Sequence, residues 1–479
     1  MKQFNNRIDG QNVGDIYTAN INPSDTTDCI GEYASGSPQD TDSAVKAARD
    51  AFTEWSRSNI QVRHDILRRA ADEIFAREEE LGKLLSREEG KPQADGIGEV
   101  RRAAQFFDFY AGEALQMRGE NGASVRPGVG VEVARAPLGV IGLITPWNFP
   151  IAIPAWKIAP ALCYGNTVVF KPAELVPASA WELVDILHRA GLPDGVLNLV
   201  MGKGSQVGQA MLDSTEIDAI SFTGSCATGA RVAASSAKHM RRYQLEMGGK
   251  NPLVVLDDAN LEIAVECALN GAYNSAGQKC TASSRFIVTK GIHDQFVKRL
   301  SERLRRMTVG DATEPSSDIG PLASAAQLSS VLSFVQTGRN EGAILVTGGK
   351  AMTLSKPGFY MSPALFVDAK PDMVISQEEI FGPVACVIKA EDYTQALHIA
   401  NDTRFGLSAG ICTTSLEHAT HFKANAQAGM ITVNLPTAGA DFHAPFGGTK
   451  SSSFGPREQG RHAIDFYTVT RTSYTRSGA

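Results

Sequence analysis

The spacing of apolar residues changes along the chain. After an extended start, apolar residues recur at helical spacing over residues 40–57 and again over residues 66–75. This spacing predicts that the first hundred residues are largely helical. From Gly139 onward, short apolar runs alternate with helix-like stretches, and such alternation of strand and helix is typical of a parallel sheet.

The apolar runs form two series, which predict two α/β domains. In the first series, strands are expected at residues 140–144, 167–170, 196–200 and 219–222. The second series follows Glu246, with strands expected at 253–256, 286–288 and 431–433 and helices at 262–273 and 294–307. Residues 121–135 and the tail after Asp465 alternate polar with β-branched residues and fit neither series. We expect them to form a small strand-rich projection that serves subunit contact.

Size, composition and charge indicate a globular protein of several domains. A chain of 479 residues exceeds what one hydrophobic core usually organises, so two or three domains are expected. Apolar residues make up 43% of the chain and charged residues 20%, as in ordinary globular proteins. The net charge of −6 argues against the basic surface of a nucleic-acid-binding protein, so small-molecule partners are favoured.

No segment of the sequence is typical of membrane insertion or export. The N-terminal stretch MKQFNNRIDG is polar and lacks both a signal-type apolar run and the Arg/Ser-rich pattern of a transit peptide. No apolar run approaches the roughly 18 residues of a membrane-spanning helix. We therefore expect a cytoplasmic protein without a membrane partner.

The seven cysteines are odd in number, widely spaced and without a CxxC pair, so the pattern predicts neither disulfides nor a metal site. Most lie in apolar surroundings typical of a core position. Cys280 differs, because it lies in the polar, small-residue stretch GQKCTASSR. Lys279 and a helix N-terminus at this point would favour the thiolate; the alternative is a surface cysteine without a role.

Two further residues have the chemistry of a catalytic site. Asn148 lies between two prolines just after the strand expected at 140–144, where its amide can donate to an oxyanion; the alternative is an Asx turn. Glu246 lies at an expected strand end beside two glycines, with apolar neighbours, and burial would raise its pKa to that of a general base. A structural, salt-bridged Glu is the alternative.

Strand ends also offer groups suited to a dinucleotide. Lys171 and Glu174 follow the second strand of the first series and can contact ribose hydroxyls, although they can equally form a solvated ion pair. Gly224 and Gly229 lie where a strand passes into a helix, which suits a phosphate. Their spacing departs from GxGxxG, so an ordinary turn is the alternative.

Two more segments have the character of ligand-binding loops. Glu379 and Phe381 precede a Gly-Pro turn and offer a carboxylate for a ribose and a ring for a nicotinamide face; an acidic helix cap is the alternative. The Gly/Ser-rich residues 445–455 lack the Walker spacing, so we interpret them as a wall of the site and not as a phosphate cradle.

Taken together, the order and spacing of these motifs resemble the aldehyde dehydrogenase superfamily from about residue 10 to the C-terminus. The resemblance is carried by TPWNFP, FKPAE, FTGS, LEMGGKNP, GQKC, EEIFGPV and PFGG. It implies an α/β fold with two doubly wound parallel-sheet domains and a small β oligomerisation element. The implied parts are a dinucleotide-binding domain of residues 1–117 and 138–248, a catalytic domain of 249–446, and a bridging element of 118–137 and 447–479, assembled as homodimers or homotetramers.

The resemblance also implies NAD(P)-dependent oxidation of an aldehyde to a carboxylic acid. Cys280 is then the nucleophile, Glu246 the general base, and Asn148 forms an oxyanion hole with the Cys280 backbone N–H. A thiolate adds to the aldehyde, hydride passes to nicotinamide, and water activated by Glu246 hydrolyses the thioester. Cofactor contacts are implied for Trp147, Lys171, Glu174, Ser225, Glu379 and Phe381. Glu246 favours water over CoA as the acyl acceptor, and Glu174 favours NAD, although some relatives also accept NADP.

Within the superfamily, the chain resembles the bacterial α-ketoglutaric semialdehyde (2,5-dioxovalerate) dehydrogenases most. Three stretches carry this resemblance: AIPAWKIAPALCYGNTVVFKPAE, YQLEMGGKNPLVVLDDANLE and GQKCTASSR. Succinate semialdehyde dehydrogenases are the near alternative, but the Arg that holds their substrate carboxylate would fall at Trp156. The same alignment implies a substrate tunnel lined by Phe149, Ile153, Trp156, Lys279, Thr281 and Phe442. Lys279 or Arg285 is the candidate for meeting a carboxylate. An apolar tunnel would also admit other aliphatic or aromatic aldehydes.

Two rivals belong to other classes of protein. One is a catalytically silent NAD-binding structural protein with the same fold, against which the presence of Cys280, Glu246 and Asn148 argues. The other is a reductase of acyl phosphates, against which the LEMGGKNP and TPWNFP contexts argue.

Overall fold

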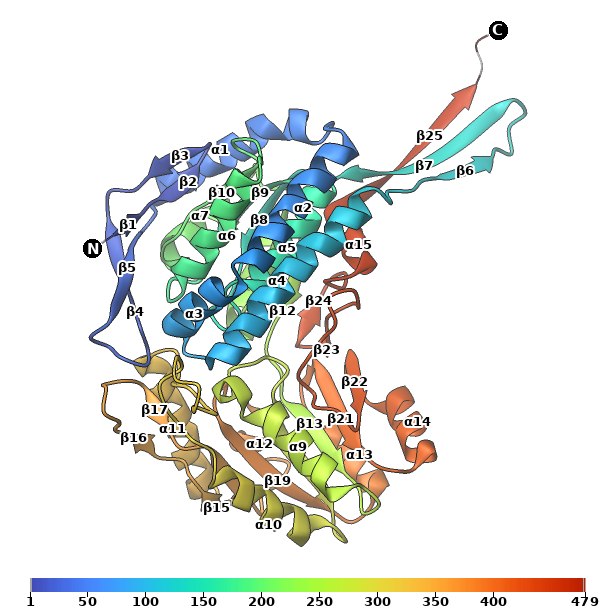
Figure 1. Ribbon diagram of the computed structural model, residues 1–479. Coiled ribbons are helices and arrows are strands. Elements are labelled where there is room, and N and C mark those ends of the chain that lie inside the picture. Colours follow the sequence, from blue (N-terminus) through green and yellow to red (C-terminus); the bar gives the residue numbers. More distant parts are fainter. Residues whose placement is uncertain (1, 477, 479) are drawn as a thin grey trace.

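A computed structural model describes residues 2–476 and residue 478. Two large sheets, each covered by helices, lie one above the other in Figure 1, and a narrow three-stranded arm projects from the upper one. Each predicted strand of the two series is present, with its ends displaced by at most three residues. The predicted α/β class with two parallel-sheet units and a small β element is confirmed.

The upper sheet has the order β24-β12-β11-β8-β9-β10-β2-β3. Its five central strands are parallel: β12 (Arg242–Glu246), β11 (Ala219–Thr223), β8 (Val140–Ile144), β9 (Thr167–Lys171) and β10 (Leu197–Leu199). The edge strands β24 (Ser453–Phe454), β2 (Asn6–Ile8) and β3 (Gln11–Val13) are antiparallel. Since β24 pairs with β12, part of the segment 447–479 that we expected in the bridging element belongs to this sheet.

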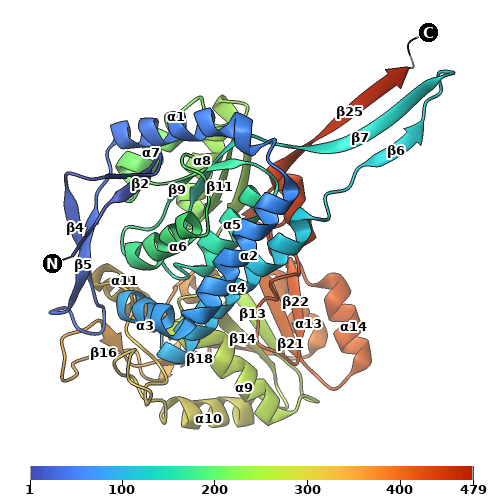
Figure 2. The same ribbon diagram turned by 45° about the horizontal axis from the view of Figure 1, so that its top comes forward.

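Successive residues of the central strands face opposite layers of helices, as the twofold period of a strand requires. Val169 packs beneath α1 (Pro38–Trp55), α7 (Gln209–Asp213) and α8 (Cys226–Lys238), which lie together in Figure 2. Its neighbours Val168 and Phe170 pack against the other layer. That layer consists of α2 (Ile60–Ala76), α3 (Glu78–Glu89), α4 (Gln93–Ala114), α5 (Ala152–Cys163) and α6 (Pro177–Arg189). The expected helical region thus spans α1 to α4, whereas the residues before it form short strands.

The lower sheet has the order β15-β18-β19-β14-β13-β21-β22 and is parallel except at β15. Its strands are β15 (Ile344–Thr347), β18 (Ala364–Val367), β19 (Val384–Ala390), β14 (Ser283–Thr289), β13 (Asn251–Val255), β21 (Ser408–Cys412) and β22 (Met430–Val433). The helices around it are α9 (Leu261–Ala272), α10 (His293–Leu304), α11 (Ala325–Asn340), α12 (Val374–Gln377), α13 (Tyr393–Asn401) and α14 (Leu416–Asn425). They enclose a second hydrophobic core, separate from that of the upper sheet.

The remaining strands form small sheets. The arm consists of β25 (Thr468–Arg476), β7 (Val129–Pro137) and β6 (Glu120–Ala123), and it extends away from both large sheets in Figures 1 and 2. This confirms the strand-rich projection predicted from residues 121–135 and the C-terminal tail. The other short elements are β1 (Gln3–Phe4), β4 (Tyr17–Ile21), β5 (Cys29–Ala34), β16 (Ala351–Met352), β17 (Tyr360–Met361), β20 (Phe405–Gly406), β23 (Thr449–Lys450) and α15 (Ile464–Tyr467).

None of the helices within residues 2–476 is both long enough and apolar enough to cross a membrane. All seven cysteines are free thiols. Cys163, Cys267, Cys386 and Cys412 are buried, as their apolar surroundings predicted.

Candidate active site

The predicted motifs of the first series meet because their strands are parallel neighbours. β12, β11, β8 and β9 lie side by side, so the loops that follow them emerge at one edge of the sheet. Ligands of open parallel sheets bind beyond this carboxyl edge. Asn148, Lys171, Ser225 and Glu246, which are up to about a hundred residues apart in sequence, are therefore placed on one side of the molecule.

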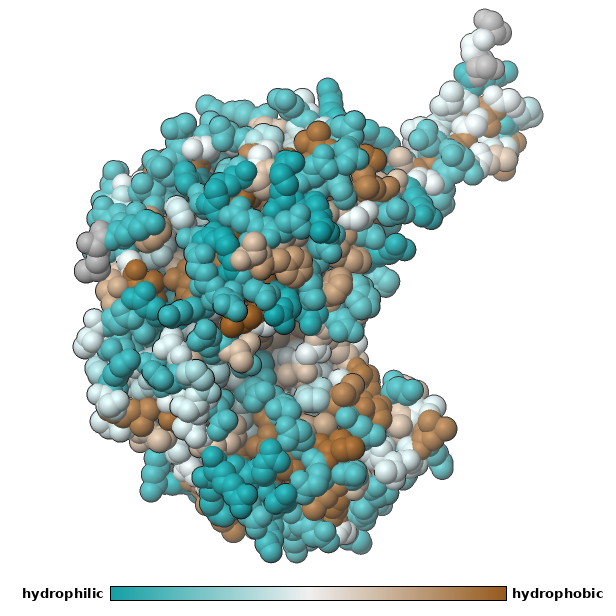
Figure 3. All heavy atoms as spheres, in the orientation of Figure 1, coloured by the Kyte–Doolittle hydropathy of each residue, from teal (hydrophilic) through white to brown (hydrophobic). Residues whose placement is uncertain are grey.

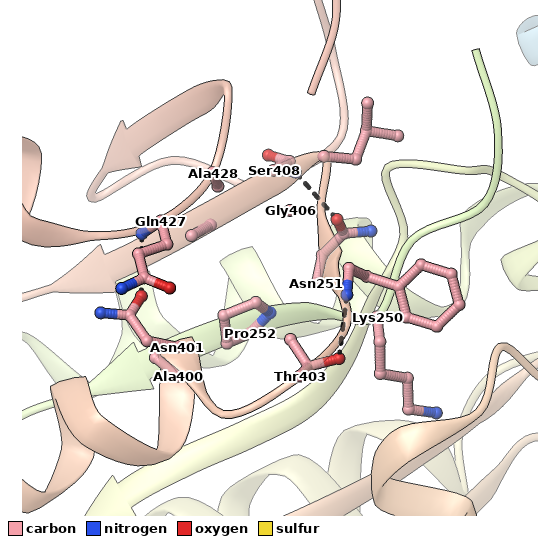
Figure 4. Close-up of a pocket in the computed structure, with 13 residues that line it drawn as sticks. Lys250, Asn251, Pro252, Ala400, Asn401, Thr403, Gly406, Ser408, Gln427 and Ala428 are labelled. Atoms are coloured by element: carbon pink, nitrogen blue, oxygen red, sulfur yellow. Dashed lines mark hydrogen bonds between the residues drawn. The ribbon is translucent and has the colours of Figure 1, made fainter. Parts of the chain in front are cut away.

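Cys280 lies in a turn between a short 3₁₀ helix (Asn274–Gly277) and β14. Asn251 fixes this turn, since its amide donates to the carbonyls of Cys280 (2.8 Å) and Ala282 (2.9 Å). The Asn251 oxygen in turn accepts from the Ser408 backbone N–H at 2.9 Å, as Figure 4 shows. The backbone around the nucleophile is thus tied to two strands of the lower sheet. Our sequence analysis did not single out Asn251, although it lies within LEMGGKNP.

The surroundings of Cys280 favour the thiol and not the thiolate. Burial, and then the nearby charges of Glu379 and Glu246, raise the pKa of Cys280 to about 12. The Lys279 ammonium donates to the Asn270 carbonyl at 3.0 Å, and burial lowers the pKa of Lys279 to about 8. The prediction that Lys279 and a helix N-terminus favour the thiolate is therefore wrong for this state, because Cys280 lies in a turn and burial dominates.

Asn148 lies in the loop after β8 with its side chain directed at the loop of Cys280. Its side-chain amide donates to the Gln278 carbonyl at 3.0 Å, and its backbone carbonyl accepts from the Lys91 ammonium at 2.7 Å. Lys91 also pairs with Glu99 at 2.6 Å, and both side chains are buried. The Lys91–Glu99 pair thus holds the backbone of Asn148 in place. A possible sequence signal was Glu99, a carboxylate beside apolar Val100 in a helical pattern.

Glu246, the last residue of β12, is buried with its carboxylate close to the Gly/Ser-rich loop. The Ser453 hydroxyl donates to it at 2.5 Å. Burial, and then the charge of Glu458, raise the pKa of Glu246 well above its usual range. Glu458 itself pairs with buried Lys157. A carboxyl group with a raised pKa suits proton transfer near neutral pH. Two cavities of the structure have Cys280 in their lining, and Glu246 lines neither of them.

One of these cavities, of about 220 Å³, lies between the carboxyl edge of the upper sheet and the lower sheet. The predicted cofactor residues among its lining are Trp147, Gly224, Ser225, Glu379 and Phe381, together with Asn148 and Cys280. The rings of Trp147 and Phe381 meet edge to face at 5.3 Å. Glu379 accepts from the Gly249 N–H at 2.9 Å, and burial raises the pKa of Glu379 to about 7.

The other predicted cofactor residues lie outside this cavity. Gly229 is inside α8 and faces the Met247 sulfur, so its missing side chain serves packing. Lys171 is buried and donates to the Pro172 carbonyl at 2.8 Å, and burial lowers its pKa to about 8. Glu174 is exposed and lines a different cavity together with Lys203. Lys171 and Glu174 form no ion pair with each other in the described part of the chain, so the alternative of a solvated pair is not what the structure shows.

A second cavity, of about 400 Å³, lies on the opposite side of Cys280. α4 and α9, which supply part of its lining, flank the indentation between the upper and lower parts of the molecule in Figure 3. Cys280 and Ile153 line both cavities. Of the predicted tunnel residues, this cavity is lined by Phe149, Ile153, Trp156, Lys279 and Thr281. Phe442 is not part of the lining; it packs edge to face on Phe109.

The arginine that lines the substrate tunnel is not the one that the sequence predicted. Arg285 is fully buried and donates to the carbonyls of Lys250, Ile399 and Ala400, so it braces the lower sheet and cannot meet a substrate. Arg102 of α4, which our sequence analysis missed, lines the cavity. Its position was not readable from the sequence, because Arg101 and Arg102 are adjacent and only the helix orientation decides which one faces inward.

Comparisons with known proteins cover nearly the whole chain. A family model described as "Aldehyde dehydrogenase family" matches residues 11–473. The α-ketoglutaric semialdehyde dehydrogenase of Bacillus subtilis is 42% identical over 457 residues, which are 95% of this chain and 94% of the relative. The mitochondrial succinate-semialdehyde dehydrogenase of Arabidopsis thaliana is 38% identical over 456 residues, 95% and 85% of the two chains. The crystal structure of betaine aldehyde dehydrogenase from Staphylococcus aureus in complex with NAD⁺ matches with a TM-score of 0.96 at 32% identity, covering 98% of this chain and 95% of that one.

Proposed function

Since the chain belongs to the aldehyde dehydrogenase family, we propose that it oxidises α-ketoglutaric semialdehyde to the dicarboxylate with NAD as hydride acceptor and water as acyl acceptor. The observation that carries this proposal is the place of Cys280, where the two cavities meet. A nucleophile there can reach an aldehyde from one side while a nicotinamide lies on the other. The α-ketoglutaric semialdehyde dehydrogenase relative supports the choice of aldehyde.

The residues on the cofactor side fit NAD. The rings of Trp147 and Phe381, which meet edge to face, offer an apolar surface near Cys280, and Glu379 offers a carboxylate for ribose hydroxyls. Ser225 caps the first turn of α8, with its hydroxyl accepting from the Thr228 N–H at 3.3 Å, and a helix N-terminus suits a pyrophosphate. Lys171 ends β9 and Glu174 follows it, where Glu174 would accept from adenosine ribose hydroxyls and repel the 2′-phosphate of NADP. Bound NAD supplies the acceptor for the hydride that leaves the substrate carbon.

The residues of this chain then divide the remaining steps. Cys280 must first lose its proton to solvent water, because only the thiolate is nucleophilic. When the thiolate sulfur bonds to the aldehyde carbon, the C=O π electrons move to the oxygen, and Asn148 Nδ2 and the Cys280 N–H stabilise the resulting oxyanion. After loss of hydride, a thioester joins the acyl group to Cys280. Glu246 takes a proton from water, the hydroxide adds to the thioester carbon, and the sulfur leaves as the thiolate.

A rate comparison among aldehydes tests the proposal. Initial rates of NADH and NADPH formation would be measured with α-ketoglutaric semialdehyde, succinate semialdehyde, glutaraldehyde and benzaldehyde over a concentration series. We expect kcat/KM to be at least tenfold higher for the keto acid aldehyde, about 1.4 kcal/mol in transition-state binding, and higher with NAD than with NADP. A preference for succinate semialdehyde, or a flat profile, would discard the proposed substrate and leave the family intact.

The projecting arm supports a proposal about assembly. β25 is an edge strand whose residues after Val469 are exposed, and long exposed edges invite pairing with another chain. We infer a homodimer or homotetramer, which light scattering after gel filtration tests. A monomer mass at micromolar concentration would contradict it.

A further inference from the structure

The substrate-side cavity carries charged groups that the chemistry at Cys280 does not use. Three cationic side chains line it, Lys91, Arg102 and Lys279, against two carboxylates, Asp95 and Glu99. The lining is therefore cationic by one charge. A neutral aldehyde would need none of these charged groups. A charged group that already has a partner within the protein is less available to a ligand than one that has none.

Four of the five charges already have partners within the protein. Lys91 pairs with Glu99 and donates to the Asn148 carbonyl, and Glu99 accepts from two backbone N–H groups after Asn148 as well. Lys279 donates to the Asn270 carbonyl. Asp95 accepts from the Ser275 hydroxyl at 3.0 Å. These groups hold the loops around Cys280 together.

Arg102 is the exception. Between residues 2 and 476 it has no hydrogen bond and no ion pair within the usual limits; its guanidinium lies 5.9 Å from the centre of the Phe442 ring. A guanidinium over an aromatic ring can keep its edge N–H groups free, and it binds a carboxylate with two parallel hydrogen bonds. The side chain is half-buried, so such a pair would be partly shielded from solvent.

The position of Arg102 on α4 suits the far end of a substrate. Asp95, Glu99, Arg102 and Phe106 follow one another at helical spacing and all line the cavity, so they form one stripe along α4. Glu99 is linked through Lys91 to Asn148 next to Cys280, and Arg102 is about 4.5 Å further along the helix axis. Phe106, beyond it, packs edge to face on Trp156.

We propose that Arg102 is a specificity-determining residue that binds the terminal carboxylate of the aldehyde substrate. This rests on the proposed function and deepens it, since it identifies which group of this chain recognises the acid. It also accounts for an anionic substrate in a tunnel that has Trp156 where succinate semialdehyde dehydrogenases are expected to carry their Arg. The substrate class is then a short aldehyde with an acid group at its other end.

A pair of matched aldehydes separates acid recognition from general activity. 4-Oxopentanal has the same carbon skeleton as α-ketoglutaric semialdehyde, with a methyl group in place of the carboxylate. The quantity measured is the ratio of kcat/KM for the two aldehydes with the full-length enzyme and saturating NAD. The control variant is Arg101→Gln, because Arg101 is exposed on α4 and pairs with Glu78 at the surface.

We expect Arg102→Gln to lower this ratio at least tenfold, mostly by raising KM for the acid aldehyde, because the interaction is present in both the ground and transition states. Arg102→Lys should keep part of the ratio, since it retains the charge but loses the two-pronged geometry. Arg101→Gln should keep the wild-type ratio. As a second readout, the inhibition constant of α-ketoglutarate against 4-oxopentanal oxidation should rise at least tenfold in Arg102→Gln.

Two results would overturn the inference: a ratio in Arg102→Gln within twofold of wild type, or a wild-type enzyme that does not distinguish the acid aldehyde from 4-oxopentanal. If wild type prefers succinate semialdehyde, the proposed substrate fails, and the same comparison is made with succinate semialdehyde and butanal. The failure of the substrate proposal and the failure of the role of Arg102 therefore give different results.

Discussion

The two cavities that meet at Cys280 are built in different ways. The cofactor-side cavity is lined mostly by loops that directly follow strands, and its polar groups are tied to the backbone, as in the bonds of Glu379 to Gly249 and of Asn148 to Gln278. The substrate-side cavity takes six of its lining residues from α4 and three from α5, and most of the others come from loops. Among its charged groups, Lys91 and Glu99 pair with each other. Lys279 and Asp95 bind neutral groups of the protein, and within residues 2–476 Arg102 has no polar partner. Backbone topology thus shapes one cavity, and the identity of helical side chains shapes the other.

This difference indicates which residues can determine the specificity for the aldehyde substrate. Substitutions on the shared or cofactor-side residues should affect every aldehyde alike, because these residues act on atoms common to all substrates. Substitutions on the substrate side should act on one class of aldehyde. The following predictions test this contrast, in order of decreasing effect.

The largest effect is expected at the residue that both cavities share. Cys280→Ser should lower aldehyde oxidation by at least about 10³-fold for every aldehyde, because a neutral hydroxyl is a far weaker nucleophile than a thiolate. NAD binding, measured by calorimetry, should stay within a fewfold of wild type. Steady-state turnover retained in this variant would contradict the assignment of the nucleophile.

Glu246→Gln should uncouple the two halves of the reaction. We expect a rapid burst of NADH of about one equivalent per active site, followed by turnover that is slower by about 10²- to 10³-fold, because water is no longer activated. Stopped-flow absorbance measures both phases, and acid quenching with mass spectrometry should detect the acyl group on Cys280. The absence of a burst would show that Glu246 is needed before the thioester forms.

Asn148→Ala should lower kcat by about 10²- to 10³-fold through loss of one oxyanion donor. The decrease should be the same for acid and neutral aldehydes within about threefold, since the oxyanion is common to both. A loss confined to acid aldehydes would instead place Asn148 with the groups that recognise the substrate.

The reactivity of Cys280 in the enzyme without cofactor should depend steeply on pH. Because its pKa is about 12, the thiolate fraction rises tenfold for each pH unit below that value, and alkylation by iodoacetamide should accelerate about a hundredfold from pH 7 to pH 9. Peptide mass spectrometry follows the Cys280 peptide, with Cys280→Ser as the background control. A plateau in this range would mean that the thiol is activated before cofactor binds.

The smallest effect is expected at Ser453, whose hydroxyl donates a hydrogen bond to Glu246. Ser453→Ala removes a hydrogen bond to the ionised carboxylate, which favours the protonated form and raises the pKa of Glu246 further. Deacylation needs the deprotonated form, so its rate should reach half-maximum at a pH higher by about 0.5 to 1 unit, and below that pH the rate should be lower by roughly three- to tenfold. The exposed neighbour variant Ser451→Ala should leave the profile unchanged.

Much of the fold and site could be predicted because the signals were local. The strands of both series are continuous apolar runs, and parallel strands buried on both faces have this pattern. Asn148 closely follows such a run, so its place at the carboxyl edge follows from the strand itself. Glu246 was expected at the end of a further strand, which the structure shows as β12. The turn of Cys280 was visible as a polar stretch next to a strand.

Other features depended on contacts between distant segments. The raised pKa of Cys280 results from burial and from Glu379, about a hundred residues away, and no local pattern contains that information. From the sequence, Arg285 and Lys279 were equal candidates for binding a substrate carboxylate. The structure excludes Arg285, because its guanidinium is buried and donates to backbone carbonyls. Gly229 was a candidate for a phosphate site because a strand passes into a helix there, but it lies against Met247.

The sequence by itself determined the family, the two parallel-sheet units and the chemical types of residue at the strand ends, because hydrophobic periodicity and short motifs act over a few residues. Tertiary structure decided which charged side chains are paired, which are buried and which face the aldehyde. The physical reason is that desolvation and ion pairing depend on the distance between groups in space. Arg101 and Arg102 are adjacent in the chain, yet one pairs with Glu78 at the surface and the other lines the cavity.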